Sequence, residues 1–470
     1  MAAEKTIRHN MAQNFVFPSD FLWGASTSAF QIEGGYDQGG RGPATTDRER
    51  PHIASARTAS DHYHHWQEDI GLMAEMGLKA YRMSFSWSRI MPAADMKINE
   101  QGLAFYDGII NALLAAGIEP IVTLYHFECP QVLVDAFGGW KSRRMIDAYI
   151  RYAAACFRHF SGRIRYWVTI NEQLIAAAAP DLTGDSETDP VRRLKNMYQM
   201  SWHMSLAEHQ AVSLLRKIDP AAKVGPVCAM QVVYPWSSQP QDVMAAQNGE
   251  EMMEFRLLDL SVRGDCSPYV SNWLHQHAFM PETREEDQEI LHSSVPDFIG
   301  VNYYFSVCAK AGDGHLHFNM PPFWVSDSYE IAANPHLLKT EWMNMGIDPD
   351  GLYVGMRKIC DRYHLPVIVT ENGFASSDRP DPDGHIHDQE RIDYLQAHVS
   401  RIGTLLAQGY TVFGYCPWSF IDALSSHQGF SKRYGFVYVR RNEEDMLDCA
   451  RIRKDSFAWY QNLIRTGSLS

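Results

Sequence analysis

The sequence contains few features that would place the protein in a membrane. Its 470 residues include no run of about 18 consecutive apolar residues, the length at which a segment becomes a candidate transmembrane helix. Residues 1–8 also lack the apolar core of a secretory signal peptide. We therefore expect no membrane association and a cytoplasmic location.

Positive charge is scarce as well. Lys and Arg together number 42 against 56 Asp and Glu, which gives a formal net charge of −14. Proteins that bind nucleic acids or anionic lipids do so largely through basic residues, so we expect neither as a partner. An anionic small-molecule substrate would need a local group of cations. The sequence leaves the oligomeric state open, and a homo-oligomer is compatible with it.

Cysteine pairs and nucleotide-binding loops are also absent. The eight cysteines form no Cys-x-x-Cys pair and most lie in apolar stretches, a pattern that favours reduced thiols over a disulfide framework. No Gly-x-Gly-x-x-Gly or Walker loop occurs, and we expect no cofactor. His62, His64 and His65 lie close together but lack a third acidic or cysteine partner, so we expect no metal.

The sequence does contain a regular alternation of strands and helices. Short apolar runs are each followed by an amphipathic helical stretch. The predicted strands cover residues 21–33, 80–87, 120–127, 164–172, 223–230, 297–304, 366–371 and 410–420. The predicted helices cover residues 61–77, 103–116, 145–160, 195–218, 241–263, 351–363, 390–408 and 455–464. Eight such units without a linker predict an α/β protein with a single (β/α)8 TIM barrel, one domain over residues 1–470.

One long segment stands outside this alternation. Residues 305–345 show no repeat of the strand–helix pattern and contain Pro-Pro-Phe-Trp. We expect this segment to pass over the mouth of the barrel.

Two predicted strands end on a glutamate. Glu172 closes Trp-Val-Thr-Ile-Asn-Glu, and Glu371 sits in Val-Ile-Val-Thr-Glu-Asn-Gly. Carboxylates are costly to bury, and the active sites of TIM barrels lie at the carboxyl ends of the strands. We therefore expect both glutamates in one site. Other predicted strand ends also carry polar or aromatic side chains that suit a sugar, namely Gln31, Glu33, Arg82, Trp87, His126, Asn171, Asn302, Tyr304, Asn372, Trp418 and Asp422.

Paired carboxylates are typical of glycoside hydrolysis. One carboxyl group stays protonated and gives its proton to the leaving oxygen, while the other stays ionised and faces the anomeric centre. A separation of about 5–5.5 Å predicts retention and about 6.5–9.5 Å predicts inversion, and the sequence leaves both open. A single Asn-Glu at a strand end is explained equally well as a helix cap or an ion-pair partner. The other polar strand ends favour the catalytic interpretation.

Four motifs resemble those of the family 1 glycoside hydrolases, the β-glucosidase-type barrels of retaining enzymes. They are Phe-Leu-Trp-Gly-Ala-Ser-Thr-Ser-Ala-Phe-Gln-Ile-Glu-Gly (21–34), Tyr-Arg-Met-Ser-Phe-Ser-Trp-Ser-Arg-Ile-Met-Pro (81–92), Thr-Ile-Asn-Glu and Thr-Glu-Asn-Gly. The resemblance covers nearly the whole chain. It implies that Glu172 is the general acid/base and Glu371 the nucleophile.

The resemblance also implies roles for neighbouring residues. Four of them, Gln31, His126, Asn171 and Trp418, would hold the sugar. Three others, Arg82, Asn302 and Tyr304, would orient Glu371 and favour its ionised form. The family usually has proline after the acid/base glutamate, whereas this sequence has Gln173. We therefore expect loop 173–190, and the aglycone side of the site, to differ.

The segment after the last strand bears on the choice of sugar. Ser425 and Ser426 stand where ordinary β-glucosidases of this family usually carry Glu and Trp. Ser425, Lys432 and Tyr434 resemble the phosphate clamp of the 6-phospho-β-glucosidase branch. A phosphate needs a cation and hydroxyl donors, and these three residues supply both. In that branch a tryptophan at the position of Ser426 goes with 6-phosphogalactosides and a small residue with 6-phosphoglucosides, so the resemblance implies a phosphorylated β-glucoside as the substrate.

Alternative interpretations remain at this point. His-Phe-Glu-Cys-Pro (126–130) also resembles the phospho branch, but Lys432 and Arg433 are explained as well by an exposed basic pair. An ordinary β-glucosidase or β-galactosidase, or a 6-phospho-β-galactosidase, would use the same scaffold. An alternative of another class is a catalytically silent barrel that binds glycosides.

Overall fold

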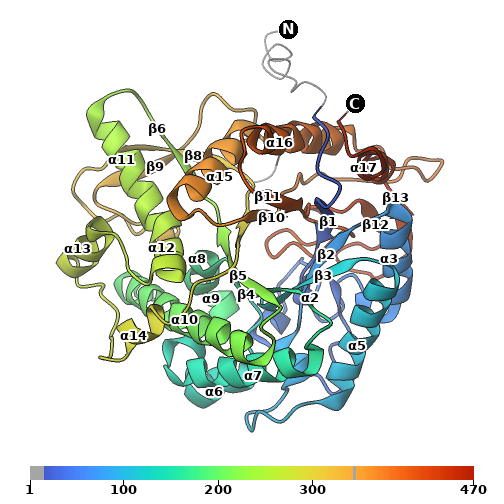
Figure 1. The fold of residues 1–470 in the computed structure, drawn as a ribbon, viewed down its shortest axis with the longest axis horizontal. Coiled ribbons are helices and arrows are strands. Elements are labelled where there is room, and N and C mark those ends of the chain that lie inside the picture. The colour runs from blue at the N-terminus through green and yellow to red at the C-terminus, as the bar shows by residue number, and fades with distance from the viewer. Residues whose placement is uncertain (1–14, 342–345, 470) are drawn as a thin grey trace.

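A closed barrel of eight parallel strands forms the centre of the computed structural model, which describes residues 15–341 and 346–469. Around the barrel the strand order is β1-β11-β10-β7-β5-β4-β3-β2, so each strand pairs with its neighbours in the chain and the last pairs with the first (Figure 1). The barrel strands are β1 (Leu22–Ser26), β2 (Ala80–Ser84), β3 (Glu119–Tyr125), β4 (Tyr166–Asn171), β5 (Lys223–Ala229), β7 (Ile299–Asn302), β10 (Val367–Glu371) and β11 (Val412–Tyr415). The predicted (β/α)8 barrel is confirmed.

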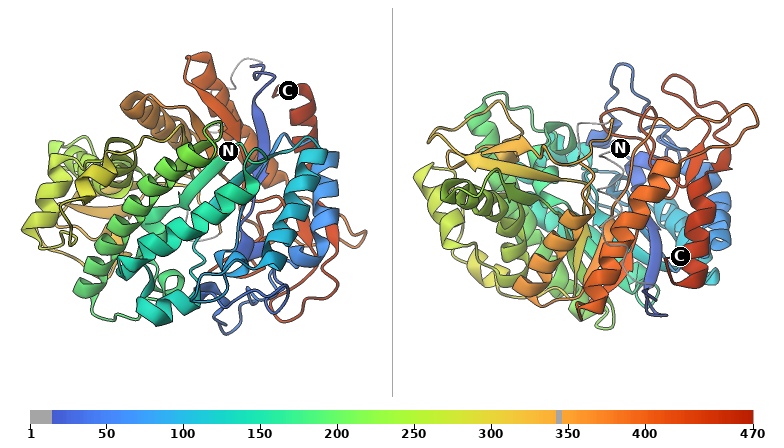
Figure 2. Two further views of the ribbon diagram at one scale, coloured as in Figure 1. Left: turned by 60° about the horizontal axis from the view of Figure 1, so that its bottom comes forward. Right: turned by 90° about the horizontal axis from the view of Figure 1, so that it is seen from above.

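Helices surround the strands on all sides, as two further views show (Figure 2). The longer ones are α3 (His62–Met76), α5 (Glu100–Ala115), α7 (Arg144–Phe160), α10 (Pro190–Ile218), α11 (Pro240–Glu250), α12 (Arg256–Arg263), α13 (Pro268–Gln276), α15 (Pro349–Tyr363), α16 (Gln389–Ala407) and α17 (Asp455–Thr466). Short helical elements are α6 (Gln131–Phe137), α8 (Gln173–Ala178), α9 (Pro180–Thr183), α14 (Asp287–Leu291), η1 (Thr45–Asp47), η2 (Gly139–Lys141), η3 (Glu251–Phe255) and η4 (Pro322–Trp324).

The strands bury both of their faces, which explains their nearly continuous apolar sequences. Side chains that point into the barrel form a separate apolar cluster of Ala80, Ile121, Val168, Val227, Phe298, Ile368 and Cys416. Side chains that point outward, such as Val122 and Trp167, join the larger core between the strands and the helices. Apolar side chains therefore fill the interior of the barrel. The polar residues at the carboxyl ends of the strands are left to form a site at the mouth.

Three predicted strands are too long. The segment 21–33 ends as a strand at Ser26 and continues as α2 (Ala29–Ile32), and 80–87 is followed by α4 (Trp87–Ile90). The segment 410–420 is a strand only in β11. Each apolar run stays buried past the strand, and a short buried run does not distinguish strand from helix by periodicity. The Ser86 hydroxyl, which accepts from the Arg89 N–H at 3.2 Å, caps the start of α4.

The segment 305–345 contains two strands that were not predicted. β8 (Ser306–Ala311) pairs with β9 (Tyr329–Ala333) and with β6 (Val232–Pro235) in a small sheet to one side of the barrel. β6 and β8 follow closely after β5 and β7, so this sheet extends from the carboxyl ends of those strands. Residues 342–345 of the predicted excursion lie outside the described residues.

The remaining features lie at the ends of the chain. β12 (Val437–Val439) and β13 (Arg451–Arg453) form a hairpin-like pair before α17. Residues 1–8, considered above as a signal segment, and the outermost parts of the predicted 1–470 domain lie outside the described residues. Within the described ranges, no helix has the length and apolar character required to cross a membrane.

Candidate active site

The two glutamates lie at the carboxyl end of the barrel. Glu371 is the last residue of β10, and Glu172 directly follows β4. Two strands, β5 and β7, separate β4 from β10 around the barrel, so the two glutamates face the mouth from different sides. Glu371 is buried, with 5% of its surface exposed, and Glu172 is partly buried.

Glu371 is held by a cation and a phenol. The Arg82 Nη1 group donates to Glu371 Oε1, and the Tyr304 hydroxyl donates to Glu371 Oε2 at 2.8 Å. Burial raises the pKa of Glu371, and Arg82 and Tyr304 act against that increase because they stabilise the charged form. The predicted contacts of Arg82 and Tyr304 with this carboxylate are present in the structure.

Glu172 has a neutral partner instead. Asn302 Nδ2 donates to Glu172 Oε1 at 2.9 Å. Burial, followed by the negative charge of Glu371, raises the pKa of Glu172 to about 8. This raised pKa favours the protonated form of Glu172 at neutral pH, while the neighbouring carboxyl group has a guanidinium that favours its ionised form. Two carboxyl groups in such different surroundings can divide the roles of acid and nucleophile.

Asn171 and Asn302 connect the two carboxyl groups. Asn171 Oδ1 accepts from Arg82 Nη2 at 2.5 Å and from Asn302 Nδ2 at 3.1 Å. Asn302 Oδ1 accepts from the Thr370 hydroxyl at 2.7 Å, which fixes the orientation of its amide. The carbonyl of Asn171 is thus occupied, and its amide nitrogen lies 3.4 Å from His126 Nε2, which leaves one of its two N–H groups for a ligand.

Two predicted sugar-binding side chains, His126 and Trp418, lie together beside this centre, and a third, Gln31, is bonded to Ser28 and Leu424. The rings of His126 and Trp418 are stacked, with centroids 6.0 Å apart. Gln31 Nε2 donates to the Leu424 carbonyl at 2.8 Å. Burial lowers the pKa of His126 well below its ordinary value, so its imidazole is neutral. Its Nε2 lies 3.4 Å from Asn171 Nδ2 and 4.0 Å from Glu371 Oε1, so this ring nitrogen faces the centre, while its Nδ1 is buried without a partner among the described residues.

Lys432 is buried without a counter-charge. Only 4% of its surface is exposed, and its ammonium forms no hydrogen bond or ion pair within the described part of the chain. Its ammonium lies over the Tyr434 ring, with Nζ 5.2 Å from the ring centroid. Burial lowers the pKa of Lys432 to about 8. An unpaired buried cation is costly, and a bound anion would remove that cost.

Arg433 differs from its neighbour. It is also buried, but its Nη1 lies 2.7 Å from Asp422 Oδ2 and it donates to the carbonyls of Val439 and Arg441. Because Lys432 and Arg433 are both buried, the interpretation of the two as an exposed basic pair is wrong. Arg433 anchors the segment, and Lys432 is left free to meet a ligand.

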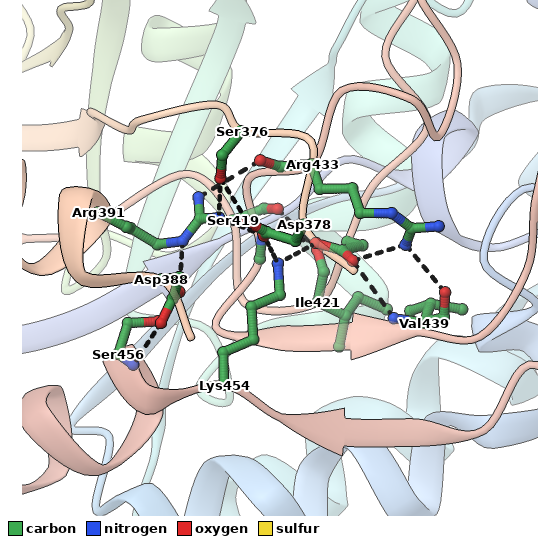
Figure 3. Close-up of polar contacts among 12 residues, drawn as sticks. Ser376, Asp378, Asp388, Arg391, Ser419, Ile421, Arg433, Val439, Lys454 and Ser456 are labelled. Atoms are coloured by element: carbon green, nitrogen blue, oxygen red, sulfur yellow. Dashed lines mark hydrogen bonds and ion pairs between the residues drawn. The ribbon is translucent and has the colours of Figure 1, made fainter. Parts of the chain in front are cut away.

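A charge-balanced network holds this segment in place (Figure 3). Asp422 accepts from Arg433, from Lys454 Nζ at 2.7 Å and from the Gly435 N–H at 2.9 Å. Arg391 joins Asp388 at 2.8 Å and also binds Asp378, which in turn pairs with Lys454. Three carboxylates thus face three cations, and the position of residues 431–435 is fixed by buried ion pairs.

The other predicted clamp residues are placed less directly. Ser425 Oγ accepts from the N–H groups of His427 and Gln428 at 3.4 Å each, within a tight turn closed by Ser425 and Gly429. Ser426 Oγ lies 2.8 Å from His427 Nδ1. No contact among the described residues joins either serine to Lys432 or Tyr434. Tyr434 does reach the centre, since its ring centroid lies 6.1 Å from that of Tyr304.

Sequence reasoning missed two basic residues near these serines. Arg50 donates to the Ser426 carbonyl. Burial, followed by the charges of Arg50 and Lys432, lowers the pKa of His427. Arg50 comes from the loop after β1 and His427 from a turn. The candidates selected from the sequence were polar residues at the ends of predicted strands, and neither of these two residues lies at such an end.

The histidine cluster has carboxylate partners. His62 Nδ1 lies 2.7 Å from Asp69, His64 Nδ1 2.5 Å from Asp61 and His65 Nδ1 3.0 Å from Glu68. Within the described ranges, no group of three or more His, Cys, Asp or Glu side chains is arranged to hold a metal ion. The three histidines are therefore accounted for by the packing and charge pairing of α3.

Comparison with known proteins agrees with this geometry. The family model for glycosyl hydrolase family 1 matches residues 13–468. The aryl-phospho-β-D-glucosidase BglC of Bacillus subtilis is 39% identical over 97% of this chain and 98% of its own length. The 6-phospho-β-glucosidase AscB of Escherichia coli is 35% identical, covering 96% and 98%.

A solved structure gives the same result for the fold. The family 1 β-glucosidase from Thermotoga maritima superimposes with a TM-score of 0.86 and 31% identity, covering 98% of this chain and 100% of that one. The family model, the sequence relatives and the superposition each span nearly the whole chain. The chain belongs to glycosyl hydrolase family 1.

Proposed function

We propose that the protein is a retaining 6-phospho-β-glucosidase. The observation that carries the choice of substrate is the buried, unpaired Lys432, which is connected to Glu371 by a chain of contacts through the rings of Tyr434 and Tyr304. A phosphate carries about −1.5 to −2 charges at neutral pH, so it would supply the counter-charge that Lys432 lacks. The relatives named as phospho-β-glucosidases support the same choice.

In the first step, Glu172 gives its proton to the leaving oxygen and Glu371 attacks the anomeric carbon. The bond from the anomeric carbon to the aglycone oxygen breaks as the bond to the Glu371 carboxylate forms. Glu172 is suited to this role because its pKa is raised to about 8. Glu371 is suited to attack because Arg82 and Tyr304 favour its charged form.

The second step reverses the role of Glu172. Once Glu371 is esterified by the sugar, its negative charge is gone, and with it one of the causes of the raised pKa of Glu172. Glu172, which is ionised after giving up its proton, then takes a proton from the attacking water as the water oxygen bonds to the anomeric carbon and the ester bond to Glu371 breaks. The same residue serves both steps because the charge of its neighbour changes between them.

The remaining site residues would bind the sugar. Asn171 has one amide N–H available and would bond the 2-hydroxyl, a contact that strengthens in the transition state. His126 and Gln31 would bond other hydroxyls, and Trp418 would cover an apolar face of the ring. Ser425, Lys432 and Tyr434 would bind the 6-phosphate, and the small Ser426 favours the gluco form.

We extend the proposal to the location of the enzyme and the source of its substrate. A cytoplasmic enzyme would receive phosphorylated β-glucosides from an import system that phosphorylates sugars as they enter the cell. An ordinary β-glucosidase is the main competing function, because the superimposed Thermotoga protein carries that name. A silent glycoside-binding barrel is less well supported, since both carboxyl groups have the partners that catalysis needs.

A direct comparison of substrates tests the proposal. The purified protein is given p-nitrophenyl β-glucoside, its 6-phosphate and the corresponding 6-phosphogalactoside at equal concentrations. We expect the 6-phosphoglucoside to have the highest kcat/KM. A higher kcat/KM for the unphosphorylated glucoside would overturn the substrate assignment, and no turnover of any of the three would favour the silent barrel.

A further inference from the structure

The backbone at Glu172 has an uncommon conformation. Glu172 lies at the turn between β4 and α8 with φ 45° and ψ 63°, in the left-handed region. This region is sparsely populated by residues other than glycine, and such residues keep it when their surroundings hold them there. The Glu172 N–H donates to the Val227 carbonyl at 2.8 Å, and its own carbonyl accepts from the Ala176 N–H at 2.8 Å. The direction of the Glu172 side chain therefore depends on how this turn is held.

A second buried glutamate contacts the chain on both sides of the turn. Glu208 Oε2, on α10, accepts from the Thr169 hydroxyl at 2.9 Å and from Gln173 Nε2 at 3.0 Å. Thr169 lies in β4 before Glu172, and Gln173 begins α8 directly after it. Ser205, also on α10, donates to Gln173 Oε1 at 3.2 Å. We call these contacts the Thr169–Glu208–Gln173 bridge.

Packing alone does not explain a carboxyl group at this place. Glu208 is 2% exposed, and no ion pair to it occurs within the described part of the chain. Its other oxygen, Oε1, forms no well-aligned hydrogen bond among the described residues, and burial raises the pKa of Glu208 while the Ser261 hydroxyl acts against that increase. A buried polar atom without a partner costs free energy, whereas an apolar side chain would fill the space without that cost.

We propose that Glu208 and Gln173 are positioning residues that hold Glu172 in the direction its acid/base role requires. Neither needs to touch the substrate. Glu208 ties the strand before Glu172 to the helix after it, and Gln173 makes that tie through its side chain. This inference rests on the proposed function, because it assumes that Glu172 is the acid/base.

The expected defect is specific to proton transfer. If the Glu172 carboxyl group is displaced, an aglycone that must be protonated as it leaves is affected, while one that leaves readily as an anion is not. A loss of stability or of sugar binding would instead lower the rates for both kinds of aglycone. The ratio of kcat/KM between two leaving groups thus separates positioning from a structural role.

The experiment uses the 6-phosphates of methyl β-glucoside and of 2,4-dinitrophenyl β-glucoside. The variants are Gln173→Leu and Glu208→Leu, which remove the bridge, and Glu208→Gln, which keeps an oxygen acceptor. We expect Gln173→Leu and Glu208→Leu to lose about tenfold or more in kcat/KM on the methyl substrate and little in glycosylation by the dinitrophenyl one. Glu208→Gln should keep most of the wild-type kcat/KM on the methyl substrate.

One control variant makes the outcome decisive. Tyr152→Phe removes a buried hydrogen bond from α7 to the Leu124 carbonyl of β3, at 3.0 Å, and so weakens the barrel without touching the bridge. It should leave the ratio between the two substrates unchanged. If the bridge variants behave like Tyr152→Phe, the inference is wrong. If Glu208→Leu does not fold, Gln173→Leu still decides the question.

The same two substrates also distinguish a failure of the proposed function from a failure of the positioning role. If Glu172 is not the acid/base, Glu172→Gln will itself fail to distinguish the two leaving groups. If Glu172→Gln distinguishes them and the bridge variants do not, the proposed function stands and the positioning role is refuted.

Discussion

Asn302 Nδ2 lies 2.9 Å from Glu172 Oε1, and this neutral amide sets Glu172 apart from Glu371, which has the Arg82 guanidinium as its partner. A cation stabilises a carboxylate much more than an amide does. Both carboxyl groups are in the same buried mouth, so the difference between their partners is what allows one to keep its proton while the other loses it.

The pH dependence of kcat/KM follows from this difference. The reaction needs Glu172 protonated, and its pKa is raised to about 8, so kcat/KM should fall as the pH rises through about 8. It also needs Glu371 ionised, and because burial raises the pKa of Glu371, kcat/KM should fall on the acidic side at a pH above the ordinary range for glutamate. A bell-shaped profile measured on the unphosphorylated p-nitrophenyl glucoside checks both limbs, because with a phosphorylated substrate the loss of charge on Lys432, whose pKa is also about 8, would add to the alkaline decrease.

The variant Glu172→Gln tests the assignment of the alkaline limb. An amide cannot donate a carboxyl proton, so the decrease near pH 8 should disappear. On a poor leaving group, kcat/KM should fall by about 10²–10⁴-fold, the usual contribution of general acid catalysis. An alkaline limb that persists in this variant would assign it to another group.

The variant Glu371→Ala tests the nucleophile. Removal of the attacking carboxylate should abolish turnover on the 6-phosphoglucoside, since no glycosyl-enzyme can form. Azide, which fits the space left by the side chain, should restore some turnover and give an α-glycosyl azide, because one inversion then replaces two. Product analysis by NMR decides, and near-normal hydrolysis without azide would rule out Glu371 as the nucleophile.

The sequence was sufficient for the barrel and for the position of the two carboxyl groups at its mouth, because each rests on a local pattern. Glu172 and Glu371 follow apolar strands, and the carboxyl ends of barrel strands meet at one mouth. Glu208 could not be found in this way, because it lies within the 29 residues of α10 and is 35 positions away from Gln173. Its role depends on how α10 packs against β4, which no local pattern specifies.

The neighbours Lys432 and Arg433 illustrate the same limit. In the sequence they are two adjacent basic residues of equal standing. In the structure Arg433 is paired with Asp422, and Lys432 has no carboxylate partner among the described residues. The distinction comes from a tertiary ion-pair network in which Arg391, Asp378 and Lys454 are contributed by separate segments.

The short helices α2 and α4 were missed for a different reason. A short buried apolar run shows no clear helical or strand periodicity in the sequence.

The network around Asp422 gives a prediction for stability. Asp422 is fully buried and pairs with both Arg433 and Lys454. Asp422→Asn leaves two buried cations with less compensation, and breaking a buried ion pair typically costs about 3–5 kcal/mol. Urea unfolding followed by tryptophan fluorescence should show a lower midpoint. The matched control is Asp448→Asn, which removes an exposed partner of Arg440 and should shift the midpoint little.

Lys432→Met provides the last prediction, and it concerns the phosphate. Methionine keeps much of the apolar stem and removes the charge, so the barrel should remain folded. A charge-assisted hydrogen bond contributes about 1.5–3 kcal/mol, so kcat/KM for the p-nitrophenyl 6-phosphoglucoside should fall by about 10–150-fold. The unphosphorylated glucoside, which has no group to meet this lysine, should be hydrolysed as well as before or slightly better. Lys97→Met, at an exposed lysine paired with Asp95, controls for the change in net charge. An equal loss on both substrates would show that Lys432 supports the site as a whole and does not recognise the phosphate.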